Sequence, residues 1–156
     1  MLKTFATICI IGMFTSSCTS KKASRTEGSH EAEQDLTMIV GTYTSGDSKG
    51  LYSFRFNEEN GTATALSEAE VENPSYLVPS ADGKFIYAVS EFSNEQAAAN
   101  AFAFNKEEGT FRLLNTQKTG GEDPCYIITN GSNVVPANYS GGSISVFPID
   151  KDGSLL

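Results

Sequence analysis

The chain has 156 residues, of which 39% are hydrophobic and 19% are charged, and its formal net charge is −8. This balance is typical of a globular domain with a core and excludes an intrinsically disordered chain. The surplus of carboxylates argues against nucleic acid or an acidic membrane surface as a partner.

The N-terminus carries a short apolar segment that predicts export. Lys3 precedes FATICIIGMF, residues 5–14, which has the length of a signal-peptide core and is too short to span a bilayer. We therefore interpret residues 1–17 as a signal peptide. Cys18 follows three small polar residues in an arrangement that resembles the lipobox of bacterial lipoproteins, with Thr15 in place of the usual leucine.

The lipobox resemblance implies a lipidated Cys18 and an exported lipoprotein of the periplasm or cell envelope, attached to the membrane only through that lipid. An ordinary secretory signal with a chance cysteine is the alternative. Residues 18–36 have little apolar content and mixed charge, which predicts a flexible linker.

The remaining cysteine excludes a disulfide framework. Cys9 lies in the predicted signal, so only Cys125 is left in the body of the chain, and one thiol forms no internal disulfide. The single histidine, His30, lies in the linker. Because a catalytic cysteine needs a nearby base, we expect Cys125 to be a small buried hydrophobic side chain.

Repetition is the main feature of the sequence after Met38. Each repeat consists of an apolar strand, a polar loop, a second alternating strand and an acidic turn ending on glycine, and the three copies are residues 38–61, 85–109 and 134–153. A second repeat, NPSYLVPSADGK and DPCYIITNGSN, begins at Asn73 and Asp123 and places a further strand before two of the copies.

Joined together, these repeats define one complete unit, residues 74–118. Its four predicted strands lie near 75–79, 85–91, 101–105 and 110–117, and Asp-Gly turns favour hairpins between strands. Residues 94–102 are the one stretch that could hold a short turn of helix. Four antiparallel strands at a period of about 40 to 50 residues predict a blade of a β-propeller.

We therefore predict an all-β fold for residues 37–156: an incomplete β-propeller of four-stranded antiparallel blades. The first unit begins at its second strand and the third stops after its third, which makes about two and a half blades. Since a closed ring has typically 4 to 8 blades, we expect an N-terminal piece of a longer protein that is inactive on its own.

The motifs GTYTSGDSKGLYSF, ENPSYL, DGKFIYAVSE, GGEDPCYI and ANYSGGSISVFPIDKDGSL together resemble the opening blades of the seven-bladed propeller lactonase family. That family includes bacterial 6-phosphogluconolactonase and fungal carboxymuconate cyclase. The resemblance implies a seven-bladed ring that hydrolyses a sugar lactone. Two residues depart from the family pattern: Pro136 lies inside a strand, where it removes a ladder hydrogen bond, and Tyr126 replaces a histidine that many members carry.

Lactone hydrolysis needs a general base and hydrogen-bond donors to the developing oxyanion. The body of the chain has no histidine, so the base must be a carboxylate, and Glu91 at a strand end is the candidate catalytic residue. Tyr43, Asn138 and Tyr139, at or beside equivalent strand ends, are candidates for substrate binding. No motif for a metal or cofactor is present.

A packing or loop role is the alternative for each of these residues. For the whole protein, the alternative is a non-catalytic exported propeller that binds a ligand or protein partner, because one fold hosts many functions.

Overall fold

The structure, a computed structural model, describes residues 36–156. The predicted signal peptide, Cys18 and nearly all of the predicted linker lie outside these residues. The described residues form eleven β-strands and no helix. It follows that residues 36–156 contain no helix long and apolar enough to cross a membrane.

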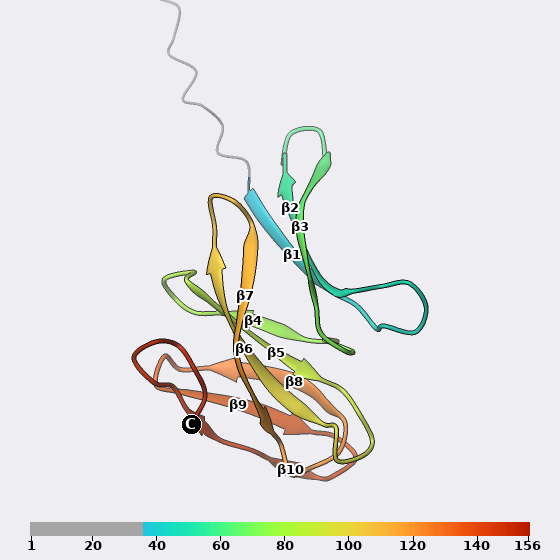
Figure 1. The fold of residues 1–156 in the computed structure, drawn as a ribbon, viewed down its shortest axis with the longest axis vertical. Coiled ribbons are helices and arrows are strands. Elements are labelled where there is room, and N and C mark those ends of the chain that lie inside the picture. The colour runs from blue at the N-terminus through green and yellow to red at the C-terminus, as the bar shows by residue number, and fades with distance from the viewer. Residues whose placement is uncertain (1–35) are drawn as a thin grey trace, which may run out of the picture. The chain divides into compact units, whose positions relative to one another are not determined.

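The strands form antiparallel sheets that follow one another along the chain (Figure 1). The first sheet consists of β1 (Leu36–Gly41), β2 (Gly50–Phe56) and β3 (Ala63–Glu70). The second consists of β4 (Leu77–Pro79), β5 (Phe85–Ser90), β6 (Ala98–Asn105) and β7 (Thr110–Lys118). The third consists of β8 (Pro124–Thr129), β9 (Asn133–Asn138), β10 (Ser143–Ile144) and β11 (Phe147–Pro148).

The second sheet confirms the predicted four-stranded unit, with its strands paired in the order β4-β5-β6-β7. The helical turn considered for residues 94–102 is wrong, because Ala98 already begins β6. Ala99 and Ala101 on this strand are fully buried. Tertiary packing overrides the helix propensity of alanine here, since small side chains fit between closely stacked sheets.

Pro136 disturbs the pairing of the third sheet, as the sequence predicted. Its carbonyl accepts a hydrogen bond from the Ser145 amide at 3.2 Å, but proline has no N–H with which to return this bond. Beside it, β10 ends at Ile144 and β11 begins only at Phe147. The third strand of this sheet is therefore split into two short pieces.

Two hydrophobic clusters pack the sheets face to face. The cluster between the first and second sheets has as its buried members Leu51, Ile86, Ala88, Phe102 and Phe104. The cluster between the second and third sheets has Tyr87, Val89, Ala99, Ala101, Ile127, Val134 and Leu155. Because successive residues of β5 and β6 point to opposite faces, the second sheet is buried on both sides.

One turn of the second sheet is also hydrogen-bonded to the first sheet and packs closely against it. The hydroxyl of Ser53, a fully buried residue of β2, donates a 2.6 Å hydrogen bond to the carbonyl of Gly109, between β6 and β7. Gly109 has φ +73°, and a Cβ there would lie 2.7 Å from both the Leu66 Cδ1 and the Ser53 Oγ. Gly61, in the equivalent turn of the first sheet, has φ +71° and nothing within 4 Å.

These two glycines form a matched pair for a stability measurement. We expect Gly61→Ala to lower the free energy of unfolding by about 1 kcal/mol, because a side chain is strained at positive φ. Gly109→Ala carries the same strain and also forces β3 away from the turn, so we expect a loss of about 3 kcal/mol. Urea denaturation of both variants measures the two losses in the free energy of unfolding. Equal losses would show that the Gly109 turn does not pack closely against the first sheet.

Candidate functional site

Glu91 occupies a repeated position at one end of the sheets. Its amide donates to the Asn73 carbonyl at 3.0 Å, and the amide of Tyr139 donates in the same way to the Asp123 carbonyl at 2.9 Å. The strand registers place Tyr43 at the corresponding position after β1. The prediction that Glu91 shares its register with Tyr43 and Tyr139 or their neighbours is therefore confirmed.

Two residues with positive φ hold the neighbouring sheets together at this end. Asn73 has φ 47° and Asp123 has φ 51°, a conformation that Asn and Asp tolerate better than most residues. The Asn73 Oδ1 accepts 3.0 Å hydrogen bonds from the amide and the hydroxyl of Thr44. The Asp123 Oδ1 accepts a 2.6 Å bond from the Ser93 hydroxyl. Each of these two hydrogen-bonded joints, at Asn73 and at Asp123, connects a loop of one sheet to the segment just before the first strand of the next sheet.

The joint at Asn73 brings Glu91 together with residues from two other segments. The Tyr43 hydroxyl, from the loop after β1, donates to the Glu91 Oε2 at 2.9 Å. The Ser75 hydroxyl, just before β4, donates to the same oxygen. Within residues 36–156, the other carboxylate oxygen, Oε1, has no hydrogen-bond partner. Glu91 is therefore held in place by one oxygen while the second is available.

Glu91 also raises the pKa of Tyr43. The pKa of the Tyr43 hydroxyl is raised, chiefly because it donates a hydrogen bond to Glu91, and further by desolvation and by the negative charge of Glu91. The Ser75 hydroxyl opposes this shift. Tyr43 is 57% exposed. It therefore presents a protonated hydroxyl at the surface at neutral pH.

Two tyrosines at matching positions of the repeat, Tyr76 just before β4 and Tyr126 on β8, lie next to the Tyr43, Ser75 and Glu91 side chains. The ring centroids of Tyr76 and Tyr126 are 4.7 Å apart, and the planes are tilted by 49°. Both residues remain partly exposed, at 42% and 43%. Tyr76 follows Ser75 directly, and Tyr126 follows Cys125. The functional grouping of this pair with Ser75 was not predicted from the sequence, although both tyrosines stand at the same position of the aligned motifs NPSY and DPCY.

Cys125 is exposed, so the prediction of a buried side chain is wrong. The register of β8 against β9 shifts between Pro124 and Tyr126. This bulge interrupts the alternation of inward and outward residues on which the prediction depended.

The other two candidates differ in accessibility. Tyr139 is 80% exposed. Asn138 is 2% exposed, and its amide nitrogen lies 3.1 Å from the hydroxyl oxygens of both Ser143 and Ser145. Since both amide hydrogens are used, Asn138 has none left to donate to a sugar.

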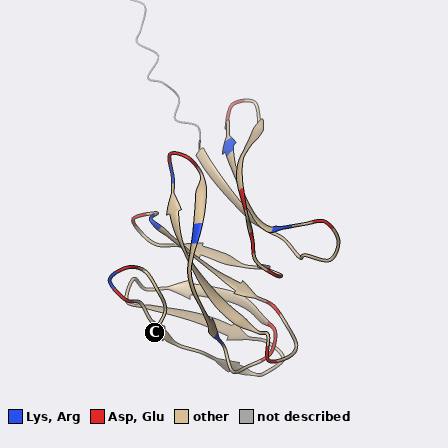
Figure 2. Cartoon of the chain, viewed as in Figure 1, with Lys and Arg blue, Asp and Glu red and all other residues tan. Residues whose placement is uncertain are grey.

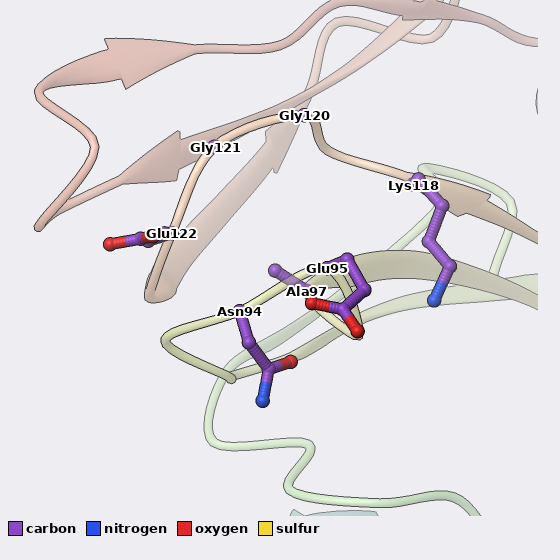
Figure 3. A pocket seen from close by; sticks show the side chains of 7 residues that line it. All are labelled: Asn94, Glu95, Ala97, Lys118, Gly120, Gly121 and Glu122. Carbon is purple, nitrogen blue, oxygen red and sulfur yellow. The ribbon is translucent and has the colours of Figure 1, made fainter.

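A separate cavity of about 320 Å³ lies between the segment before β6 and the segment at and after the end of β7. Figure 3 shows Glu95 and Lys118 on its facing sides, with the carboxylate of Glu122 directed away from both. Among the residues that the structure describes, no group of three or more His, Cys, Asp or Glu side chains is placed to hold a metal ion.

The pKa of Tyr43 provides a direct test of its contact with Glu91. We expect Glu91→Gln to lower this pKa toward the ordinary value for tyrosine, because the substitution weakens the hydrogen bond that the Tyr43 hydroxyl donates to residue 91 and removes the negative charge that disfavours the phenolate. Ultraviolet titration of phenolate formation, with Tyr43→Phe to assign the transition, measures the shift. Glu108→Gln, at the opposite end of the sheet, is the control. An unchanged Tyr43 titration in Glu91→Gln would show that the two side chains are not paired in solution.

Comparisons with known proteins agree with the fold of residues 36–156. A sequence profile of the family described as "Lactonase, 7-bladed beta-propeller" matches residues 37–156. The 6-phosphogluconolactonase of Bacillus subtilis is 37% identical over 122 residues, which cover 74% of this chain and 34% of that protein. The 6-phosphogluconolactonase of Formosa agariphila is 34% identical over 125 residues, which cover 76% of this chain and 35% of that protein.

Solved structures show the same similarity. A Bacteroides fragilis protein assigned as a 6-phosphogluconolactonase superposes with a TM-score of 0.79 at 69% identity, covering 81% of this chain and 35% of that one. A periplasmic gluconolactonase of Pseudomonas aeruginosa superposes with a TM-score of 0.70 at 29% identity, covering 78% and 36%. The chain thus spans about a third of the length of these relatives. With its profile match, its relatives and its stacked antiparallel sheets, the chain belongs to the lactonase family of seven-bladed β-propellers.

Proposed function

We propose that this chain carries part of the active site of a sugar-lactone hydrolase, a carboxylic ester hydrolase that opens the lactone ring to the free acid. The names of the relatives, 6-phosphogluconolactonase and gluconolactonase, support this reaction class. The observation that carries the proposal is the Glu91 carboxylate, held through Oε2 by two hydroxyls and free at Oε1.

In the proposed mechanism Glu91 is the general base. Its Oε1 takes a proton from water as the water oxygen bonds to the lactone carbonyl carbon. The ring C–O bond of the resulting tetrahedral intermediate then breaks, and the proton passes from Glu91 to the departing ring oxygen. The products are a carboxyl group and a hydroxyl, so the atoms balance. A positioned base of this kind contributes about 10²–10⁴ in rate.

Tyr43 and Ser75 have positioning roles in this mechanism. Their hydroxyls both bond to Oε2, which keeps Oε1 pointing in one direction without using it. Loss of orientation alone is costly in catalysis, because a base must lie within hydrogen-bond reach of the proton it removes. In this proposal the hydroxyl of Tyr139, which is exposed, bonds to the sugar.

We further propose that hydrolysis needs more blades than those of residues 36–156. The relatives are about three times as long as the segment matched here. Propeller active sites combine residues from several blades around one channel, and a closed ring needs at least about four. We therefore expect no turnover by this chain alone.

A chimera tests the catalytic proposal. Residues 37–156 of this chain replace the matching segment of the Bacteroides fragilis relative, whose 69% identity favours compatible packing. We expect the chimera to hydrolyse a sugar lactone and Glu91→Gln in it to lower kcat about 10²–10³-fold. Glu95→Gln, which removes a nearby carboxylate outside the Glu91 contacts, should leave kcat unchanged.

The lactonase proposal fails if neither the chimera nor the parental protein turns over glucono-1,5-lactone or its 6-phosphate. The role of Glu91 fails if Glu91→Gln retains the kcat of the unsubstituted chimera.

We also propose that the chain is an exported lipoprotein anchored through Cys18, as the pattern before this residue suggests. In a bacterial host given radiolabelled palmitate, we expect the wild-type chain and Cys125→Ser to incorporate label and Cys18→Ser to lose it. Labelling that persists in Cys18→Ser would contradict the anchor.

A further inference from the structure

We infer that the part of the active site built by this chain selects an uncharged sugar lactone over a phosphorylated one. The inference rests on the proposed lactonase function and names its substrate class. It follows from the charges, the aromatic side chains and the hydroxyls that the structure gathers around Glu91.

The loops at the Glu91 end of the sheets are strongly acidic. These loops, residues 42–49, 71–76, 91–97, 119–123 and 139–142, contain the carboxylates Asp47, Glu72, Glu91, Glu95, Glu122 and Asp123. Lys49 is the single Lys or Arg in them, and it pairs with Glu70 at 2.9 Å. The excess of acidic over basic positions in these loops is visible in Figure 2.

Lys118, at the end of β7, is the other cation at this end. It lines the separate cavity, together with Glu95 and Glu122. In Figure 3 its ammonium group lies on the side of Glu95. Glu70 and Glu72 line a second cavity together with Lys118. Neither of the two cavities beside Lys118 is lined by Tyr43, Ser75 or Glu91.

The immediate surroundings of Glu91 carry no compensating positive charge among the described residues. Its hydrogen-bond donors are the neutral hydroxyls of Tyr43 and Ser75. The carboxylate that acts on the Tyr43 hydroxyl is that of Glu91, which is negative at neutral pH. A phosphate group is normally held by Arg, Lys or a cluster of backbone amides.

Asp123 adds a second permanent charge near the same end. The Ser140 and Ser93 hydroxyls donate to its carboxylate and hold its pKa below the usual value. It therefore stays ionised at neutral pH. A phosphate dianion about 6 Å from one carboxylate, in water-like surroundings, is disfavoured about tenfold.

The same surface suits the neutral part of a sugar. Carboxylates accept hydrogen bonds from sugar hydroxyls, and tyrosine hydroxyls both donate and accept them. The partly exposed rings of Tyr76 and Tyr126 offer apolar faces to the C–H groups of a sugar ring. Recognition of an unmodified lactone thus needs nothing beyond the side chains on this surface.

The experiment compares kcat/KM of the chimera on glucono-1,5-lactone and on its 6-phosphate. We expect the neutral lactone to be preferred at least about tenfold at low ionic strength, and added salt to narrow the gap because it screens the carboxylates. Glu122→Gln should raise kcat/KM for the phosphorylated substrate several-fold and leave that for the neutral lactone unchanged. Glu108→Gln, at the opposite end of the sheet, should change neither value.

A preference for the phosphorylated lactone, or a ratio that Glu122→Gln does not change, would overturn the inference while leaving the lactonase proposal intact. Absence of turnover on both substrates, by chimera and parental protein alike, would instead contradict the proposed function.

Discussion

The burial of the second sheet on both faces is the constraint on which the rest of the structure depends. Phe102 faces the first sheet and Ala101 the third, and both are at most 1% exposed. A sheet covered on both sides cannot alternate apolar and polar residues, so both faces of β5 and β6 are apolar. Because the second and third sheets are stacked closely, β6 carries alanine on the face toward the third sheet. The Ser53–Gly109 hydrogen bond adds a contact between the first and second sheets.

The candidate site follows from this stacking. Glu91 leaves β5 at the end where the loop after β1 and the segment before β4 converge, and Asn73 joins these segments. The candidate site combines the phenol of Tyr43, the hydroxyl of Ser75 and the carboxylate of Glu91, which come from three different segments. No single sheet could have assembled them. The candidate site is therefore a product of the joint between two sheets.

Charge gives this end of the molecule its chemical character. The loops around Glu91 are acidic, and the residues closest to its carboxylate are neutral hydroxyls and aromatic rings. Such a surface suits hydroxyl-rich neutral molecules and opposes anions.

The sequence by itself determined the all-β class, the four-stranded unit, the glycine turns and the equivalence of Tyr43, Glu91 and Tyr139. These features depend on local alternation and turn residues, which are readable within one repeat. Only the tertiary structure decided that Tyr43 reaches Glu91 across 48 positions, that Asn138 is buried, and that a bulge exposes Cys125. Contacts of this kind depend on how one sheet lies on the next, and side-chain packing between sheets has no periodic signature in the chain.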